Sequence, residues 1–169
     1  MDIVLYPDEP LGKKAERYRT VGPEVAKLAS EMFEIMAVYD GCGLAGPQVG
    51  VLKAIIVIHL PETEEDYCLV NPEILESEGS ETAEEGCLSL PRIYAPVTRC
   101  TRIRVRTLDK EGHLLDFEAT GLLARIIQHE CDHLQGLIFL DRVDLLTREA
   151  KLQEWAEVRE QMMSALTGR

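Results

Sequence analysis

The stretch that most constrains this chain runs from Gln128 to Gly136 and contains the sequence His-Glu-Cys-Asp-His. On an α-helix, His129 and His133 lie about 40° apart around the axis, so both imidazoles can reach one metal ion. Glu130 lies on an adjacent face, where its carboxylate can contact a water on that ion without being a ligand. The pattern therefore predicts a metal-assisted hydrolase built on a helix.

The residues around this stretch predict where the helix begins and ends. Thr120 suits the N-cap position, and Gly136 suits the C-terminal end. The first turns of the helix are heavily apolar, with Leu122, Leu123, Ile126 and Ile127.

Two histidines do not complete a metal site, and the residues leave two sources for a third ligand. A metzincin-like arrangement would need a histidine where Phe139 stands, so that class is excluded. A thermolysin-like arrangement would use a glutamate from a following helix, either Glu149 or Glu154. A cysteine thiolate is the other source. Cys131 points to the far side of the helix, which leaves as candidates Cys42, Cys68, Cys87 and Cys100.

Length and composition bound the protein class. The length of 169 residues predicts a single domain that spans residues 1–169. The composition is typical of a globular protein, because 46% of the residues are hydrophobic and 28% are charged. The net charge of −12 argues against nucleic-acid binding. We expect no membrane association and a cytoplasmic location, because the chain lacks both a run of ~20 apolar residues and a signal-peptide pattern. Five cysteines, an odd number, indicate reduced thiols.

The first half of the chain contains a glycine-rich loop between a helix and strands. Met1 to Tyr18 reads as an extended arm, and a core helix starts at Gly22-Pro23. The ten residues from Gly41 to Gly50 include four glycines, but they lack the lysine and the following Ser or Thr of a phosphate loop. Gln48 in this loop could donate its amide N–H to a developing oxyanion.

The middle of the chain reads as strands joined by turns. Apolar runs predict strands over Ala54 to Leu60 and Tyr67 to Leu75. The acidic stretch from Glu76 to Glu85 reads as a solvated connection. It leads into the turn from Gly86 to Pro91, where Cys87 is accessible enough to bind a metal.

The second half predicts a hairpin before the histidine helix and a helix after it. Arginines alternate with apolar residues from Arg102 to Thr107, and Leu114 to Ala119 forms the returning strand. Beyond the histidines, Leu137 to Leu140 reads as a short strand. A last helix follows, capped by Asp144 or Thr147.

Three stretches taken together resemble the peptide deformylase family over nearly the whole chain. Gly41 to Gln48 is similar to the family's glycine-rich motif, Glu85 to Pro91 to its E-G-C-L-S motif, and Gln128 to Gly136 to its Q-H-E-x-D-H-L-x-G motif. The resemblance implies that Cys87 is the third ligand beside His129 and His133. It also implies one divalent ion, Fe²⁺ in the cell, with Zn²⁺, Ni²⁺ or Co²⁺ as other occupants.

The resemblance further implies the fold and the reaction. We expect an α+β domain in which antiparallel sheets pack around a central metal-binding helix, with an N-terminal helix and a C-terminal helix. The implied reaction is hydrolysis of the N-formyl group from the initiator formylmethionine of nascent polypeptides, with release of formate. A structural zinc protein and a thermolysin-like peptidase are the rival functions.

The residues support this reaction with definite roles. Glu130 would act as the base, while the Gln48 side chain and the Leu88 backbone N–H would hold the oxyanion. Glu85 and Asp132 are candidates for orienting the metal ligands. Ile126 and Leu122 lie three and seven residues before His129, so they extend its face into an apolar strip for the methionine side chain. The substrate-binding candidates are thus Cys42, Gly43, Leu122 and Ile126.

Two features depart from the family pattern. Gly46 stands where an alanine is usual, which predicts a looser glycine-rich loop. The last helix mixes its basic residues Arg148, Lys151 and Arg159 with several glutamates. This mixture argues against ribosome docking through a basic C-terminal extension, which some family members have. We expect a monomer.

Overall fold

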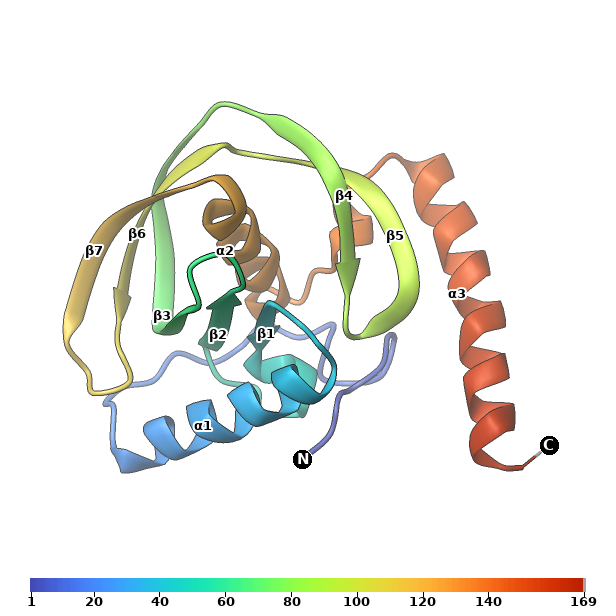
Figure 1. The fold of residues 1–169 in the computed structure, drawn as a ribbon, viewed down its shortest axis with the longest axis horizontal. Coiled ribbons are helices and arrows are strands. Elements are labelled where there is room, and N and C mark those ends of the chain that lie inside the picture. Colours follow the sequence, from blue (N-terminus) through green and yellow to red (C-terminus); the bar gives the residue numbers. More distant parts are fainter. Residues whose placement is uncertain (169) are drawn as a thin grey trace.

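The computed structural model describes residues 1–168 and contains three α-helices and seven strands (Figure 1). In chain order the elements are α1 (Pro23–Val38), β1 (Gly43–Ala45), the 3₁₀ turn η1 (Gly46–Val49), β2 (Ile55–Leu60), β3 (Glu65–Glu78), β4 (Glu81–Cys87), β5 (Leu90–Arg99), β6 (Arg102–Leu108), β7 (Leu114–Thr120), α2 (Gly121–Leu134), η2 (Phe139–Arg142) and α3 (Leu145–Leu166). The predicted α+β domain with a central histidine helix is confirmed.

The strands form two antiparallel sheets. Five strands pair in the order β1-β2-β3-β6-β7, and β4 pairs with β5 in a separate two-stranded sheet. Figure 1 shows the larger sheet curving around α2, while α3 stands beside β5 at the edge of the molecule. The β3–β6 pairing contains two irregularities in register, and such bulges bend a strand.

Strand β2 has helices on both faces, which explains its unbroken apolar run. Ile56 and Ile58 pack in the cluster that includes α2, whereas Ile55 and Val57 pack in the cluster that includes α1. Because successive strand side chains point to opposite faces, this alternation places α1 and α2 on opposite sides of the sheet. Helix α2 therefore packs on a strand that is covered on both faces.

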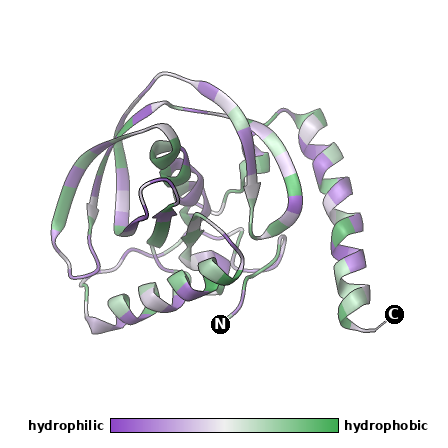
Figure 2. Cartoon of the chain, viewed as in Figure 1, coloured by the Kyte–Doolittle hydropathy of each residue, from purple (hydrophilic) through white to green (hydrophobic). Residues whose placement is uncertain are grey.

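A third cluster joins the two-stranded sheet to the C-terminal part of the chain. Leu90, Ile93 and Val97 of β5 pack with Phe139 of η2 and Trp155 of α3. Trp155 is buried, and hydrophilic and hydrophobic residues otherwise mix along α3 (Figure 2). Asp144, one of the two residues predicted to cap this helix, occupies the N-cap position. Its side chain accepts a hydrogen bond from the Thr147 N–H at 2.9 Å.

The histidine helix, α2, begins and ends where the sequence predicted. Thr120 occupies the N-cap, although its side chain makes no capping hydrogen bond. After Leu134 the chain reverses at Gly136, whose φ of 78° favours glycine. A Cβ at Gly136 would also lie 2.8 Å from the backbone of Gly12, so this glycine lets the N-terminal arm pass close to the helix end.

Two predicted local structures are wrong. Residues Glu76 to Glu85 are mostly strand, because β3 runs to Glu78 and β4 begins at Glu81. Cross-strand arginines stabilise the acidic residues there: Arg102 pairs with Glu78 at 2.9 Å. Leu137 to Leu140 is no strand. The Asp141 carboxylate accepts a hydrogen bond from the Ile138 N–H at 2.9 Å and starts the 3₁₀ turn η2 instead.

Within the residues described, none of the helices combines the length and the apolar character needed to cross a membrane.

Candidate metal centre

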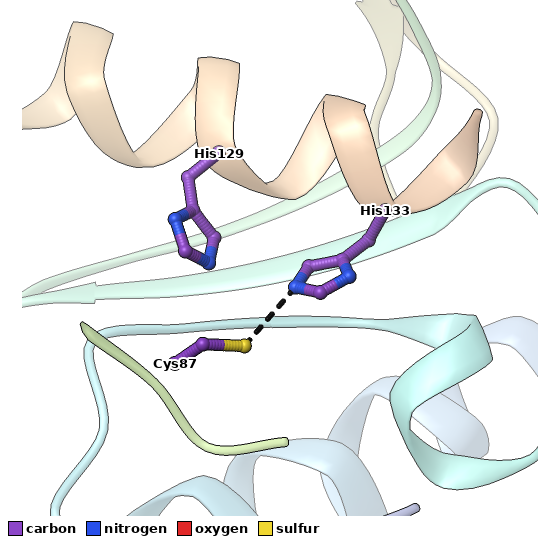
Figure 3. A group of neighbouring side chains, drawn as sticks. All are labelled: Cys87, His129 and His133. Atoms are coloured by element: carbon purple, nitrogen blue, oxygen red, sulfur yellow. Dashed lines mark hydrogen bonds between the residues drawn. The ribbon is translucent and has the colours of Figure 1, made fainter. Parts of the chain in front are cut away.

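Three side chains converge between α2 and the end of β4. His129 and His133 project from the same face of α2, and Cys87 approaches them from the last residue of β4 (Figure 3). The Cys87 Sγ lies 3.3 Å from the His133 Nε2, and the ligand atoms of all three residues lie within 4.8 Å of one another. The structure thus assembles one sulfur and two nitrogen donors around one point.

The chemistry of these donors fits a divalent ion. Burial lowers the pKa of His133 well below its usual value, which keeps this imidazole neutral and able to bind a metal. Burial also opposes a charge on His129, yet the charges of Glu130 and Cys87 and the hydrogen bond of Glu85 raise its pKa well above the usual value. The surroundings of His129 therefore stabilise a positive charge there, which a divalent ion would supply.

The outer nitrogen of His129 is held by Glu85. Its Nδ1 lies 2.8 Å from the Glu85 Oε1, so the Nε2 faces the other ligands. Burial by itself would raise the pKa of Glu85, but hydrogen bonds from His129 and Arg99 outweigh it and lower that pKa to about 2. Arg99 donates from its Nε and Nη2 at 2.9 and 3.0 Å. A permanently ionised Glu85 fixes both the orientation and the tautomer of His129.

Asp132 holds the other side of the metal helix but touches neither histidine through a hydrogen bond in the described residues. It accepts hydrogen bonds from Arg99 at 2.6 Å and from Arg142 at 2.7 and 3.1 Å. Arg99 thus bridges Glu85 on β4 and Asp132 on α2. This buried bridge links the hairpin that carries the cysteine to the helix that carries the histidines.

Glu130 is buried beside the ligands and is not one of them. Within residues 1–168 its Oε1 has no hydrogen-bond partner. Burial raises the pKa of Glu130 to about 7, despite the opposing charge of His129. A carboxylate with a pKa near neutrality, free of a structural partner and next to a metal centre is suited to proton transfer.

Gly43 makes room for this carboxylate. A Cβ at residue 43 would lie 2.6 Å from the Glu130 Oε2 and 2.7 Å from the Ile126 Cγ2. The glycine therefore allows β1 to pass directly against the Glu130 carboxylate.

We expect Gly43→Ala to lower turnover by about tenfold to a hundredfold, because the new methyl group displaces the Glu130 carboxylate by a fraction of an ångström to an ångström. Metal content should stay unchanged, since residue 43 does not contact the ligands. Gly12→Ala is the control, because a Cβ there meets nothing within 4 Å. Turnover equal to that of the parent protein in Gly43→Ala would contradict this assignment.

The Gln48 amide is oriented by the backbone of its own loop. Its Oε1 accepts a hydrogen bond from the Ala45 N–H at 2.9 Å, so its Nε2 must point the other way. The Nε2 lies 3.2 Å from the Ser89 Oγ and 3.5 Å from the Cys87 Sγ. Gln48 is 1% exposed, which makes it a fixed N–H donor at the edge of the metal centre.

Gly46 tightens this loop, contrary to the expectation of a looser one. It is buried, and a Cβ there would lie 2.6 and 2.7 Å from the carbonyl oxygens of Lys53 and Val51. The loop that carries Gln48 therefore packs directly against the following backbone.

Comparisons with known proteins agree with this geometry. A family model described as "Polypeptide deformylase" matches residues 1–149. The chain belongs to this family. A peptide deformylase from Thermodesulfovibrio yellowstonii is 46% identical over 152 residues, which cover 88% of this chain and 92% of that relative. Peptide deformylase 1 of Bacillus subtilis is 40% identical over 152 residues, covering 90% of this chain and 95% of the relative.

Solved deformylase structures share the fold. The crystal structure of a peptide deformylase from Legionella pneumophila has a TM-score of 0.90 at 36% identity and covers 96% of both chains. The Ehrlichia chaffeensis enzyme in complex with actinonin has a TM-score of 0.87 at 36% identity, covering 91% of this chain and 94% of that one.

The other ligand sources considered for this family member lie apart from the metal centre. Within residues 1–168, the single group of donors close enough to hold an ion is Cys87 with the two histidines. Glu149 and Glu154 are exposed on α3 and do not belong to it. The group likewise contains none of the other cysteines, which are Cys42, Cys68, Cys100 and Cys131.

Of the residues predicted to bind substrate, Gly43 and Ile126 lie next to Glu130. Ile126 is 8% exposed and its Cγ2 lies beside Gly43. Leu122, one turn earlier on α2, is 44% exposed. Cys42 directly precedes β1 in the chain and is partly buried. Burial raises the pKa of its thiol, and the negative charges of Asp40 and Glu130 raise it further. Leu88 begins the two-residue turn between β4 and β5, directly after the ligand Cys87.

Sequence reasoning missed three polar residues of this deformylase site. Arg99 and Arg125 pair with Glu85, and Ser89 lies next to Gln48. The alternation of β5 carries a signal for Arg99, because it falls on the inward face with Ala95 and Val97. An arginine on a buried face needs an acidic partner, so this position predicts a buried ion pair. Arg125 sits one turn before His129, but its partners are visible only in the fold.

Proposed function

We propose that the protein is a peptide deformylase that hydrolyses the N-formyl group of formylmethionine at the start of nascent polypeptides, using Cys87, His129 and His133 to hold one divalent ion. The observation that carries this proposal is the buried Glu130, which has a free carboxylate oxygen beside a group of two histidines and one cysteine. Membership of the deformylase family supports the reaction class.

The bound ion would polarise the formyl oxygen and lower the pKa of the attacking water. Glu130 accepts the proton of that water and later donates it to the departing amine, which a carboxyl group with a pKa of about 7 can do in both directions. The Gln48 Nε2 and the Leu88 backbone N–H donate to the oxygen that becomes negative. Losing one such donor typically costs about 3 kcal/mol in the barrier.

The family resemblance supports a metal identity with which the donor set is compatible. We propose Fe²⁺ in the cell, with Zn²⁺, Ni²⁺ or Co²⁺ as functional replacements, because two imidazoles and a thiolate bind all four ions.

The proposed partners are nascent N-formylmethionyl chains. We further propose that the enzyme is a monomer and that it acts in the cytoplasm. Each basic residue of α3 pairs with an acidic one: Arg148 with Asp141 at 3.3 Å, Lys151 with Glu154 at 3.3 Å, and Arg159 with Asp8 at 3.0 Å. This helix therefore offers no free basic stripe in the described residues, which argues against ribosome docking through it and against direct contact with nucleic acid.

The experiment that tests this reaction compares formyl-Met-Ala-Ser with acetyl-Met-Ala-Ser and measures the release of formate or acetate together with the free amine. We expect rapid release of formate and at least about a hundredfold slower release of acetate, since the acetyl methyl group would enter the space next to Glu130 and Gly43. Cleavage of the Met-Ala bond in either peptide would instead indicate a peptidase.

For the methionine side chain we propose the apolar strip formed by Ile126 and Leu122, with Cys42 as the opposite wall and the Gly43 backbone between. Burying an unbranched thioether there contributes about 1.5–3 kcal/mol, so formyl-Met peptides should be preferred over formyl-Ala peptides by roughly tenfold to a hundredfold.

Ile126→Ala is expected to reduce this preference several-fold by removing one wall of the strip, while leaving the metal content unchanged. The measurement is kcat/KM for formyl-Met and formyl-Ala peptides. Ile74→Ala on β3, where the isoleucine is 38% exposed, is the matched control and should keep the preference of the parent protein. A full methionine preference in a folded, metal-loaded Ile126→Ala variant would show that Ile126 does not line the pocket.

A further inference from the structure

The ligands of the metal centre come from two separate structural units. His129 and His133 lie on α2, whose closest backbone neighbours are β1, β2 and β7 of the five-stranded sheet. Cys87 ends β4, which pairs only with β5 in the smaller sheet. The distance between the thiolate and the imidazoles therefore depends on what holds the β4–β5 hairpin against α2.

Arg125 makes three hydrogen bonds from α2 to this hairpin. Its Nη1 donates to the Glu85 Oε2 at 2.6 Å and to the Val97 carbonyl oxygen at 2.9 Å. Its Nη2 donates to the Glu81 carbonyl oxygen at 2.7 Å. One side chain thus reaches both strands, β4 through Glu81 and Glu85 and β5 through Val97.

The Glu85 carboxylate is where this contact meets the metal centre. Its Oε1 takes the hydrogen bonds of His129 and of the Arg99 Nη2, and its Oε2 takes those of the Arg99 Nε and of Arg125. Arg99 lies on the hairpin itself and fixes Glu85 relative to α2 only indirectly, through its hydrogen bond to Asp132 at 2.6 Å. Arg125 starts on α2 and fixes Glu85 directly, two residues before the ligand Cys87.

We propose that Arg125 is a positioning residue of the metal centre, which sets the place of the Cys87 thiolate relative to the two histidines by holding both strands of the hairpin and the Glu85 carboxylate on the metal helix. This inference rests on the proposed metal site. Arg125 touches none of the three ligand atoms and acts through Glu85 and the hairpin backbone. Its effect falls on metal binding more than on the chemical step.

The planar shape of the Arg125 guanidinium suits these three acceptors. A planar fork can donate to a carboxylate and to carbonyl oxygens that lie in different directions, whereas a lysine ammonium is a point charge on a flexible stem. The Arg125 side chain is 13% exposed and that of Glu85 only 6%, so little water could replace the lost donor at the Glu85 carboxylate, whereas the contact with the Glu81 carbonyl oxygen is exposed.

The test uses Arg125→Met, which keeps the length of the side chain and removes its donors. Arg104→Met is the matched control, because Arg104 makes a two-pronged pair with Asp116 at 2.9 and 3.0 Å on an exposed part of β6. Two quantities are measured in apoprotein reloaded with Co²⁺: the Co²⁺ affinity by competition with a chelator, and the absorption band that a thiolate bound to Co²⁺ produces.

We expect Arg125→Met to bind Co²⁺ about 10–100-fold more weakly and to show a shifted or weaker thiolate band, with formate release per bound ion changed less than the affinity. Arg104→Met should match the parent protein in both quantities. Arg125→Lys should fall between Arg125→Met and the parent. If Arg125→Met does not fold, Arg125→Lys alone tests the proposal. This variant keeps the positive charge, so a Co²⁺ affinity below that of the parent protein would come from the loss of the planar guanidinium donors.

Parental affinity and an unchanged thiolate band in Arg125→Met, or parental affinity in Arg125→Lys when only that variant folds, would overturn the proposal. An equal loss of affinity in Arg104→Met would overturn it too, because the effect would then be general. A parent protein that binds Co²⁺ without any thiolate band would instead contradict the proposed metal site, so the two failures are distinguishable.

Discussion

Glu130→Gln is expected to keep about one divalent ion per chain while losing about 10²–10⁴-fold in turnover. The amide has nearly the shape of the carboxylate, but it cannot accept the proton of the attacking water. The ligand group does not include Glu130, so the metal should remain. The measurement is kcat for formyl-Met-Ala-Ser together with metal content on the same sample.

Glu149→Gln is the matched control, since Glu149 is an exposed glutamate of α3. It should behave as the parent protein. Parental turnover in Glu130→Gln would remove the base from the mechanism, and it would also be the outcome for a protein in which the metal is purely structural.

Cys87→Ser is expected to weaken metal binding by more than about a hundredfold, and with it to abolish activity at ordinary metal concentrations. A serine hydroxyl is not ionised at neutral pH, so the site loses its only anionic ligand, an effect larger than that of an outer hydrogen-bond partner. Equilibrium dialysis with Zn²⁺ measures the loss.

Cys100→Ser is the control for this substitution, because Cys100 is a partly buried cysteine outside the ligand group. Its metal affinity should equal that of the parent protein. Unchanged metal affinity in Cys87→Ser would contradict the assignment of Cys87 as the third ligand.

The histidine helix could be predicted from sequence because its information is local. Helical spacing alone puts His129 and His133 on one face, and Gly136 ends the helix through a backbone conformation that favours glycine. The alternation from Arg102 to Thr107 likewise follows directly from the two-residue period of a strand.

The third ligand could not be derived from spacing, because it depends on tertiary structure. Cys87 lies 42 residues before His129 in the chain. It ends a strand of the two-stranded sheet, which has no strand pairing with the larger sheet. Only the resemblance to the family singled it out among the cysteines. The same limitation hid Arg125, whose partners Glu81 and Glu85 lie far away in sequence.

The acidic residues of β3 and β4 show why composition misled the strand prediction. Glutamates are unfavourable in isolated strands, so the stretch from Glu76 to Glu85 reads as a loop. In the fold Arg102 lies opposite Glu78 and offsets the charge, while Glu85 turns inward to Arg99 and His129. The pairing of β3 with β6, a strand distant in the sequence, therefore outweighed the low strand preference of the glutamates.

The most direct test of the central claim is a metal titration of the apoprotein, with the rate of formate release from formyl-Met-Ala-Ser as the readout. Chelator-treated protein should be inactive, and anaerobic addition of Fe²⁺ or Co²⁺ should restore activity in proportion to the metal added, ending at one ion per chain. Formate release by metal-free protein, or a titration that ends at two ions, would contradict a single catalytic ion held by Cys87, His129 and His133.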